Sequence, residues 1–299
     1  MKKQLILLLV TVSTALSAQS YGSNYRRVSR EVEKIMSISS DIIDGVMTYE
    51  KEKKVAPLID AQFTTYRKSK RSFARLTDES EAAMIEVSTT ELSAIIECSS
   101  TELAEWLKED PRSGYGHRYV EKVGGHYKAI LAELESYSTT YEVNVRDSDV
   151  LLRFQAQMEL LSYTKEMKRG ASTVDSLVDV LKAEVGHTDL DLMYATQKAL
   201  VKALSKHLRG YGEEMFYNGQ TQLHEAYQKY YFELLELASA DLLADLTKMK
   251  YDLVEYNSIA KSTETSARKT LSFFDNEKKL LSKREARFVK GNLPKAPKK

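Results

Sequence analysis

The chain of 299 residues is 29% charged and 42% hydrophobic, and its formal net charge is only +1. This composition is typical of a folded globular or coiled protein and excludes a largely disordered chain. The single cysteine, Cys98, excludes a disulfide within the chain, so packing must supply the stability.

Residues 1–18, MKKQLILLLVTVSTALSA, have the pattern of a secretory signal peptide. Two lysines give a basic start, an apolar run covers 5–12, and small residues precede an expected cleavage after Ala18, with Ser17 as the alternative. The run is shorter than the roughly 20 residues that span a bilayer, so an uncleaved anchor is the weaker interpretation. We therefore expect an exported chain, periplasmic or secreted, and the leader is typical of bacteria.

Proline spacing and hydrophobic periodicity predict helices almost throughout the remaining chain. Only Pro57 and Pro111 lie in its body, and none falls between 112 and 293, as is typical of helices. Apolar residues recur at the i, i+3, i+4, i+7 spacing of one helix face. The sequence predicts an all-α fold, an elongated bundle of long amphipathic helices with coiled-coil-like packing. The expected helices cover about 24–54, 58–109, 117–138, 150–169, 172–185, 188–208 and 221–277. A break of the second region at LTDES, 76–80, with Asp78 as the cap of the next helix, is the alternative to one helix there.

Two interruptions are expected along this bundle. The pair Gly124 and Gly125 should bend or split the helix that contains it. The segment YEVNVRDSD, 141–149, alternates like a strand but has no partner strand, so we expect a loop. The bundle domain is expected to span 19–277, with an internal boundary near 111–116 or in the loop at 141–149.

The stretch STTELSAIIECSSTELAEWLKEDP, 88–111, allows two interpretations. Capping boxes at Ser88 and Ser99 would begin two short helices, whereas one apolar stripe without Gly or Pro favours a single helix. We favour the single helix, on which Trp106 lies on the packed stripe and is expected in the core. Cys98 lies at the edge of that stripe with no neighbour that lowers its pKa, so we expect a free thiol, with an intermolecular link as the alternative.

The sequence contains none of the short motifs that indicate an enzyme. The P-loop, G-x-G-x-x-G, G-x-S-x-G, H-E-x-x-H, C-x-x-C and EF-hand patterns are all missing. We therefore predict a non-enzymatic protein without catalytic residues and without a cofactor. His117, Glu121 and His126 are close enough in sequence to face one metal ion, but histidines on charged helices are usually solvated, so no metal site is predicted.

Tyrosine outnumbers phenylalanine eighteen to eight, and many tyrosines lie between 211 and 256. A tyrosine ring can be buried while its hydroxyl reaches water, so a tyrosine-rich helix face is one kind of partner surface. Ordinary packing in a slim bundle explains the same bias equally well.

The C-terminal segment 278–299 has nine Lys or Arg residues and one acidic residue, Glu285, while acidic side chains outnumber basic ones in 19–277. We expect a partly disordered basic tail, which either contacts an anionic surface or is merely solvated, including by folding back on the acidic body. The residues predicted to bind a partner are Tyr217, Tyr227, Tyr230, Tyr231, Lys283, Arg284 and Arg287.

These features favour an exported, non-enzymatic helical interaction or scaffold protein of a bacterial envelope-associated or secreted assembly. Its partners would be other proteins or further copies of itself. The alternatives are a secreted membrane-active protein of the pore-forming type and a periplasmic helical protein that binds a metal or small ligand. The sequence carries no specific nucleic-acid signature, and we expect no transmembrane segment.

Overall fold

The computed structural model describes residues 2–50, 54–76, 79–109, 114–145, 148–185, 187, 189–210 and 215–295, with side chains from 20 onward. In these ranges the chain is helical, and β-pairing is limited to an isolated bridge between Tyr217 and Gln220. The predicted all-α fold is confirmed. In chain order the helices are α1 (Lys2–Met47), α2 (Ala56–Phe73), η2 (Glu79–Glu81), α3 (Ala82–Ser100), α4 (Glu102–Lys108), α5 (Gly114–Thr140), α6 (Asp149–Met167), α7 (Ala171–Glu184), α8 (Leu190–Gly210), α9 (Gln222–Glu236), η3 (Leu237–Asp241), α10 (Leu242–Tyr256) and α11 (Lys261–Asn292).

The chain divides into two compact units. Unit 1 consists of Met1–Glu159 and Leu293–Lys299, and unit 2 of Leu160–Asn292. The division falls inside α6, beyond both positions where the sequence predicted a boundary, 111–116 and 141–149. A continuous helix carries the chain from one unit to the other, so no glycine, proline or loop marks the division in the sequence.

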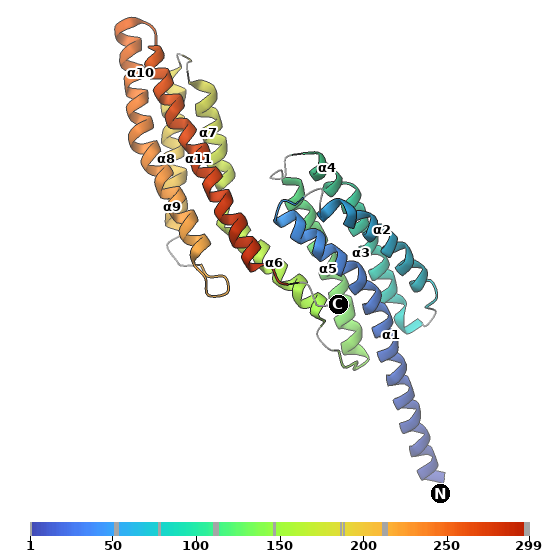
Figure 1. Ribbon diagram of the computed structural model, residues 1–299. Helices are drawn as coiled ribbons and strands as arrows, with labels where there is room; N and C mark the ends of the chain where they lie inside the picture. The colour runs from blue at the N-terminus through green and yellow to red at the C-terminus, as the bar shows by residue number, and fades with distance from the viewer. Residues whose placement is uncertain are drawn as a thin grey trace. The chain divides into compact units, whose positions relative to one another are not determined.

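In unit 1, α1, α2, α3 and α5 lie side by side, and the first turns of α1 extend beyond the other helices (Figure 1). Trp106 of α4 is fully buried, which confirms its predicted place in the core. It fits because α5 has a glycine opposite the indole. A Cβ at Gly116 would lie 2.8 Å from Trp106 Nε1 and 2.9 Å from Val46 Cγ1, closer than real contacts allow.

A buried polar network connects the four helices of this core. Gln62 of α2 donates to Ser39 Oγ of α1 at 2.7 Å and accepts from Ser99 Oγ of α3 at 2.6 Å. Tyr127 of α5 bonds Ser39 at 3.0 Å, and Ser99 reaches Tyr119 at 3.5 Å. Burial raises the pKa of Tyr119 to about 12 and also raises the pKa of Tyr127, so both tyrosine hydroxyls stay protonated. Such a satisfied network favours one register of the helices over others.

Two predictions about local helix structure in unit 1 are wrong. The stretch 88–111 forms two helices, because Thr101 leaves helical geometry at φ −105° and ψ −81°. Ser99 does not cap the second helix, since its hydroxyl is used in the core network. The helix break predicted at the glycine pair does not occur, because α5 is continuous there. Instead, Gly124 makes room for α6: a Cβ there would lie 2.8 Å from Met158 Sδ.

Unit 2 packs α7 on α8, α8 on α9, and α11 against both α9 and α10 (Figure 1). A π-helical turn, η3, joins α9 to α10 without breaking the helical path. Such a turn frees a backbone acceptor. Buried Gln197 of α8 uses this acceptor, because its Nε2 donates to the carbonyl oxygen of Ala238 at 2.8 Å.

The single helix predicted over 221–277 is interrupted after Tyr256. Asn257 adopts a left-handed conformation with φ 51°, which ends α10. Asp252 then accepts from the backbone N–H of Ala260 at 3.1 Å and from the Thr263 hydroxyl at 2.7 Å, and so fixes the start of α11. Because α11 continues to Asn292, residues 278–292 are helical where the sequence predicted a partly disordered tail. Residues 296–299 lie outside the described ranges.

Candidate interaction surface

The seven predicted partner-binding residues fall into two groups, and the first is buried. The tyrosines at 217, 227, 230 and 231 expose 8%, 2%, 6% and 0% of their surface. Tyr227 donates its hydroxyl proton to Glu285 Oε2 at 2.8 Å, and Tyr231 stacks on His207 with ring centroids 5.2 Å apart. These four tyrosines are therefore packed inside unit 2, which agrees with the packing interpretation of the tyrosine bias and leaves little of their surface for a partner.

The second group, Lys283, Arg284 and Arg287, is exposed on α11. Two earlier cations of this helix form salt bridges: Arg268 with Glu264 at 2.8 Å and Lys278 with Asp175 at 2.7 Å. From Lys279 onward, no exposed cation of α11 has an acidic oxygen within 4.0 Å among the described residues. Cations are favoured near a helix C-terminus, but that effect is modest and leaves their charge available to a partner. The residues concerned are Lys279, Lys283, Arg284, Arg287 and Lys290.

Arg284 and Arg287 line a hollow of about 520 Å³ between the start of α9 and the end of α11. Asn292 donates to Gln220 Oε1 at 3.3 Å at one end of it. A guanidinium presents several donors in a planar fork, which fits a carboxylate or a phosphate better than an ammonium does. The basic hollow is therefore suited to an anionic group. Its lining consists of Gln220, Gln222, Leu223, Ala226, Arg284, Arg287, Phe288, Gly291 and Asn292.

A second hollow of about 670 Å³ lies farther along the same two helices and is acidic. Burial raises the pKa of Glu277, and a hydrogen bond to Glu233 and the charge of that carboxylate raise it further. Arg284 and Lys229 oppose this rise. Two carboxyl groups in contact attract a cation. The acidic lining consists of Glu233, Glu236, Asp241 and Glu277, with Phe273 beside them.

On the same helix two apolar side chains are exposed: Phe273 at the acidic hollow, and Leu280 between the two hollows. Phe273 exposes 43% of its surface and Leu280 exposes 44%. We define the α11 stripe as Phe273, Glu277, Leu280, Arg284 and Arg287. The sequence interpretation found its arginines but missed its first three members, because it ended the helix at Glu277 and so did not continue one face of the helix from Phe273 to Arg287. The alternating spacing of four and three residues was the signal that would have revealed them.

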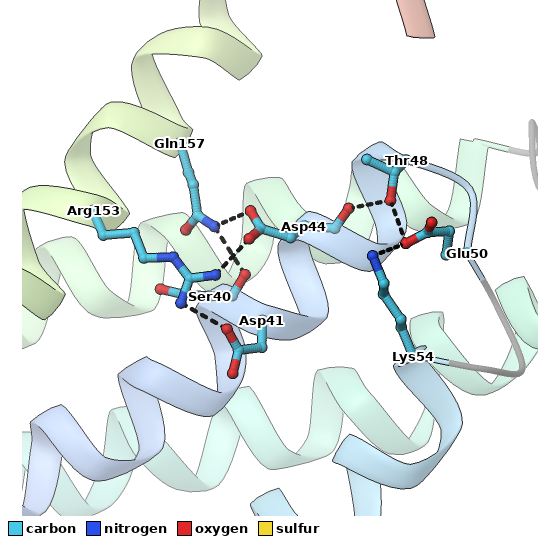
Figure 2. A network of polar contacts seen from close by, with 8 residues as sticks. All are labelled: Ser40, Asp41, Asp44, Thr48, Glu50, Lys54, Arg153 and Gln157. Carbon is cyan, nitrogen blue, oxygen red and sulfur yellow. Dashed lines mark hydrogen bonds and ion pairs between the residues drawn. The ribbon is translucent and has the colours of Figure 1, made fainter. Parts of the chain in front are cut away.

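Unit 1 contains a separate buried ion cluster, in which α6 binds α1 (Figure 2). Arg153 of α6 exposes 5% of its surface, and its guanidinium donates to Asp41 Oδ1 at 2.6 Å and to Asp44. Gln157 Nε2 donates to Asp44 Oδ1 at 2.5 Å and to the carbonyl oxygen of Ser40 at 2.8 Å. Burial opposes the charged guanidinium, but the two aspartates raise the pKa of Arg153 above its ordinary value.

This cluster has the properties of a structural contact. Burial raises the pKa of Asp44, while Arg153 and Gln157 act in the opposite direction. The guanidinium of Arg153 and the Nε2 of Gln157 are both used in contacts with α1, although Gln157 Oε1 and Arg153 Nε are buried without a hydrogen-bond partner among the described residues. Further contacts extend it to the end of α1 and beyond, through Thr48, Glu50 and Lys54 (Figure 2).

The candidate metal ligands and the cysteine do not form a site. His126 Nδ1 lies 2.7 Å from Glu91 Oε2, and among the described residues no three His, Cys, Asp or Glu side chains converge as metal ligands would. Cys98 is a free, buried cysteine, and burial raises the pKa of its thiol, which disfavours the reactive thiolate. Within the described ranges, no helix has the length and hydropathy of a membrane span.

The fold and these surfaces define an all-α bundle protein with a charged and apolar face on α9 and α11. Comparison of the chain with protein-family models, with curated proteins and with solved structures found no match.

Proposed function

We propose that this chain is a non-enzymatic helical interaction or scaffold protein. The observation that carries the proposal is the outer side of α11, where exposed cations without salt bridges in the described ranges lie beside Phe273 and Leu280. Arginine and aromatic side chains such as phenylalanine are enriched at protein interfaces. Contact with another folded protein would pair these charges and remove the apolar surface from water.

We further propose that the chain is exported and acts in a bacterial envelope-associated or secreted assembly. The basic start and apolar run of residues 1–18 support this location. The first turns of α1 extend past the helices that pack around its later turns (Figure 1), which agrees with a leader that the bundle does not need. N-terminal sequencing of the protein from the native cell tests this part, and a mature chain that begins at Met1 would contradict it.

Cross-linking in the native cell tests the interaction proposal. A lysine-reactive cross-linker followed by mass spectrometry should recover one or two proteins in near-stoichiometric amounts, linked through Lys279, Lys283 or Lys290. The control variant replaces these three lysines with arginine. It keeps the charge, so the partner should still co-purify while the cross-links disappear. Turnover of a substrate by the purified protein, or cross-links spread evenly over both units, would contradict the proposal.

A second candidate function, membrane activity, is favoured by one observation at the turn between α10 and α11. Tyr251, Val254 and Tyr256 expose 57%, 74% and 67% of their surface there. Aromatic and apolar side chains at a helical tip suit the interface of a bilayer. The purified protein should then release dye from vesicles of phosphatidylcholine and phosphatidylglycerol, and Val254→Lys should abolish the release. Intact vesicles with the unmodified protein would exclude this function.

A further inference from the structure

We propose that the α11 stripe binds the same stripe of a second copy of this chain, with the two α11 helices antiparallel about a two-fold axis at Leu280. This proposal rests on the proposed interaction function and names the partner. It follows from the spacing of the stripe, from the order of its charges and from the exposure of its apolar residues.

The spacing places the stripe along one side of the helix. Its members follow one another at intervals of four, three, four and three residues, the pattern with which one helix packs along another. From Phe273 to Arg287 the stripe is about 21 Å long at 1.5 Å per residue. All five members lie in the described part of α11, and Phe273, Leu280, Arg284 and Arg287 are exposed there.

The order of the charges makes the stripe complementary to itself. The acidic residue Glu277 lies three residues before Leu280, and Arg284 lies four residues after it. Rotation about a two-fold axis at Leu280 brings Glu277 of each copy beside Arg284 of the other and Phe273 opposite Arg287. These pairs are an ion pair and a cation–π contact, and every contact in such an interface occurs twice.

The acidic and basic hollows beside the stripe are also complementary in charge between the two copies. The acidic hollow at Glu233 and Glu277 would receive the arginines of the second copy, while the basic hollow at Arg284 and Arg287 would receive its carboxylates. Glu277 carries an unfavourable contact with Glu233 that Lys229 and Arg284 of the same chain offset only in part. A second chain supplies a further cation. An unrelated acidic partner would pair the arginines and leave the contact between Glu233 and Glu277 as it is.

A pair of charge reversals tests the arrangement. Sedimentation velocity from about 1 to about 200 µM should show a monomer–dimer equilibrium for the unmodified protein, the range expected for a small, polar interface. Arg284→Glu alone and Glu277→Arg alone should each weaken dimerisation on the order of tenfold to a hundredfold, because a like-charge contact then occurs twice. An equal mixture of the two variants restores both ion pairs, so it should form a heterodimer about as stable as the original dimer.

The matched control is Lys279→Glu. It changes the charge of α11 as Arg284→Glu does, but Lys279 is not part of the stripe, so dimerisation should be unchanged. Leu280→Asp is a second disruptive variant, since it places two carboxylates at the axis. Far-UV circular dichroism and the melting temperature of each variant report whether the fold is intact.

Each outcome decides the proposal. A monomer at every concentration overturns it and leaves the interaction function open to the cross-linking experiment. Dimers that survive Arg284→Glu and Leu280→Asp place the interface elsewhere and overturn it too. Dissociation by both single reversals, with recovery in the mixture, supports the antiparallel arrangement, because the two-fold axis brings position 277 beside position 284 of the other chain in two equivalent contacts.

Discussion

Replacing Arg153 with methionine removes the cation of the buried cluster in unit 1 while keeping most of the side-chain volume. The side chain of Asp44, which exposes only 23% of its surface, then has no positive charge beside it. Breaking a buried ion pair from one side costs about 3–5 kcal/mol. Asp41 exposes 43% of its side chain, so water can hydrate it once the arginine is gone. We therefore expect the free energy of unfolding to fall by about 2–4 kcal/mol at neutral pH, somewhat less than for a fully buried pair.

The pH dependence of this loss follows from the pKa of Asp44, which burial raises above its ordinary value of 3.8 in the folded chain. A carboxyl with a raised folded pKa binds more protons in the folded state. Its contribution to stability is therefore complete below the unfolded pKa and is lost as the pH rises through the folded pKa. Without Arg153 the folded pKa rises further, so the penalty of Arg153→Met should shrink as the pH falls from about 7 to about 4.

Urea unfolding monitored by circular dichroism measures both effects. Asp41→Asn is the control and should cost no more than about 1 kcal/mol, because its ion pair is solvated. The double variant Asp44→Asn with Arg153→Met removes both buried charges and should recover part of the loss. A penalty below about 1 kcal/mol at neutral pH, or one that grows on acidification, would refute the assignment of Arg153 as the residue that holds α6 on α1.

Three further predictions concern the cores of the units. Gly116→Ala should destabilise the protein by about 1–3 kcal/mol, because the new methyl group would clash with Trp106. Gly125 has no atom within 4 Å of an added Cβ, so Gly125→Ala should stabilise the helix by up to about 1 kcal/mol. Equal effects of the two substitutions in urea unfolding would disprove the close packing at Gly116. Cys98, whose pKa burial raises, should react with iodoacetamide at pH 8 far more slowly than in urea, and equal rates would show an accessible thiol. Asp252→Ala should cost about 1 kcal/mol through loss of the α11 cap, and an unchanged urea midpoint would contradict that role.

The fold could be predicted where local periodicity decides the structure. The helices expected over 150–169, 172–185 and 188–208 match α6, α7 and α8 to within a few residues. The errors lie where one residue changes the backbone direction. Asn257 was a visible signal for a helix end, because asparagine tolerates a left-handed conformation, whereas Thr101 carries no comparable signal.

The buried polar groups could not be predicted, because they depend on which helices meet. Gln62 and Arg153 have side chains that are usually exposed, and nothing in their local sequence marks them as interior. Gln62 is satisfied only because three other helices supply hydroxyl groups around it. The tyrosines of α9 illustrate the reverse error: their number suggested a surface, and the packing of α8, α9 and α11 encloses them.

The basic segment shows why charge composition and helical periodicity must be considered separately. Nine cations in residues 278–299 suggested a tail, yet Leu281, Glu285, Phe288 and Val289 continue the buried face of α11 through the same segment. The exposed cations Lys279, Lys283, Arg284, Arg287 and Lys290 lie on the other sides of α11 and are not part of that buried face. Reversing one of them should therefore leave stability nearly unchanged. A loss of association after such a change would then measure the surface itself, and this separation makes the charge-reversal experiment decisive.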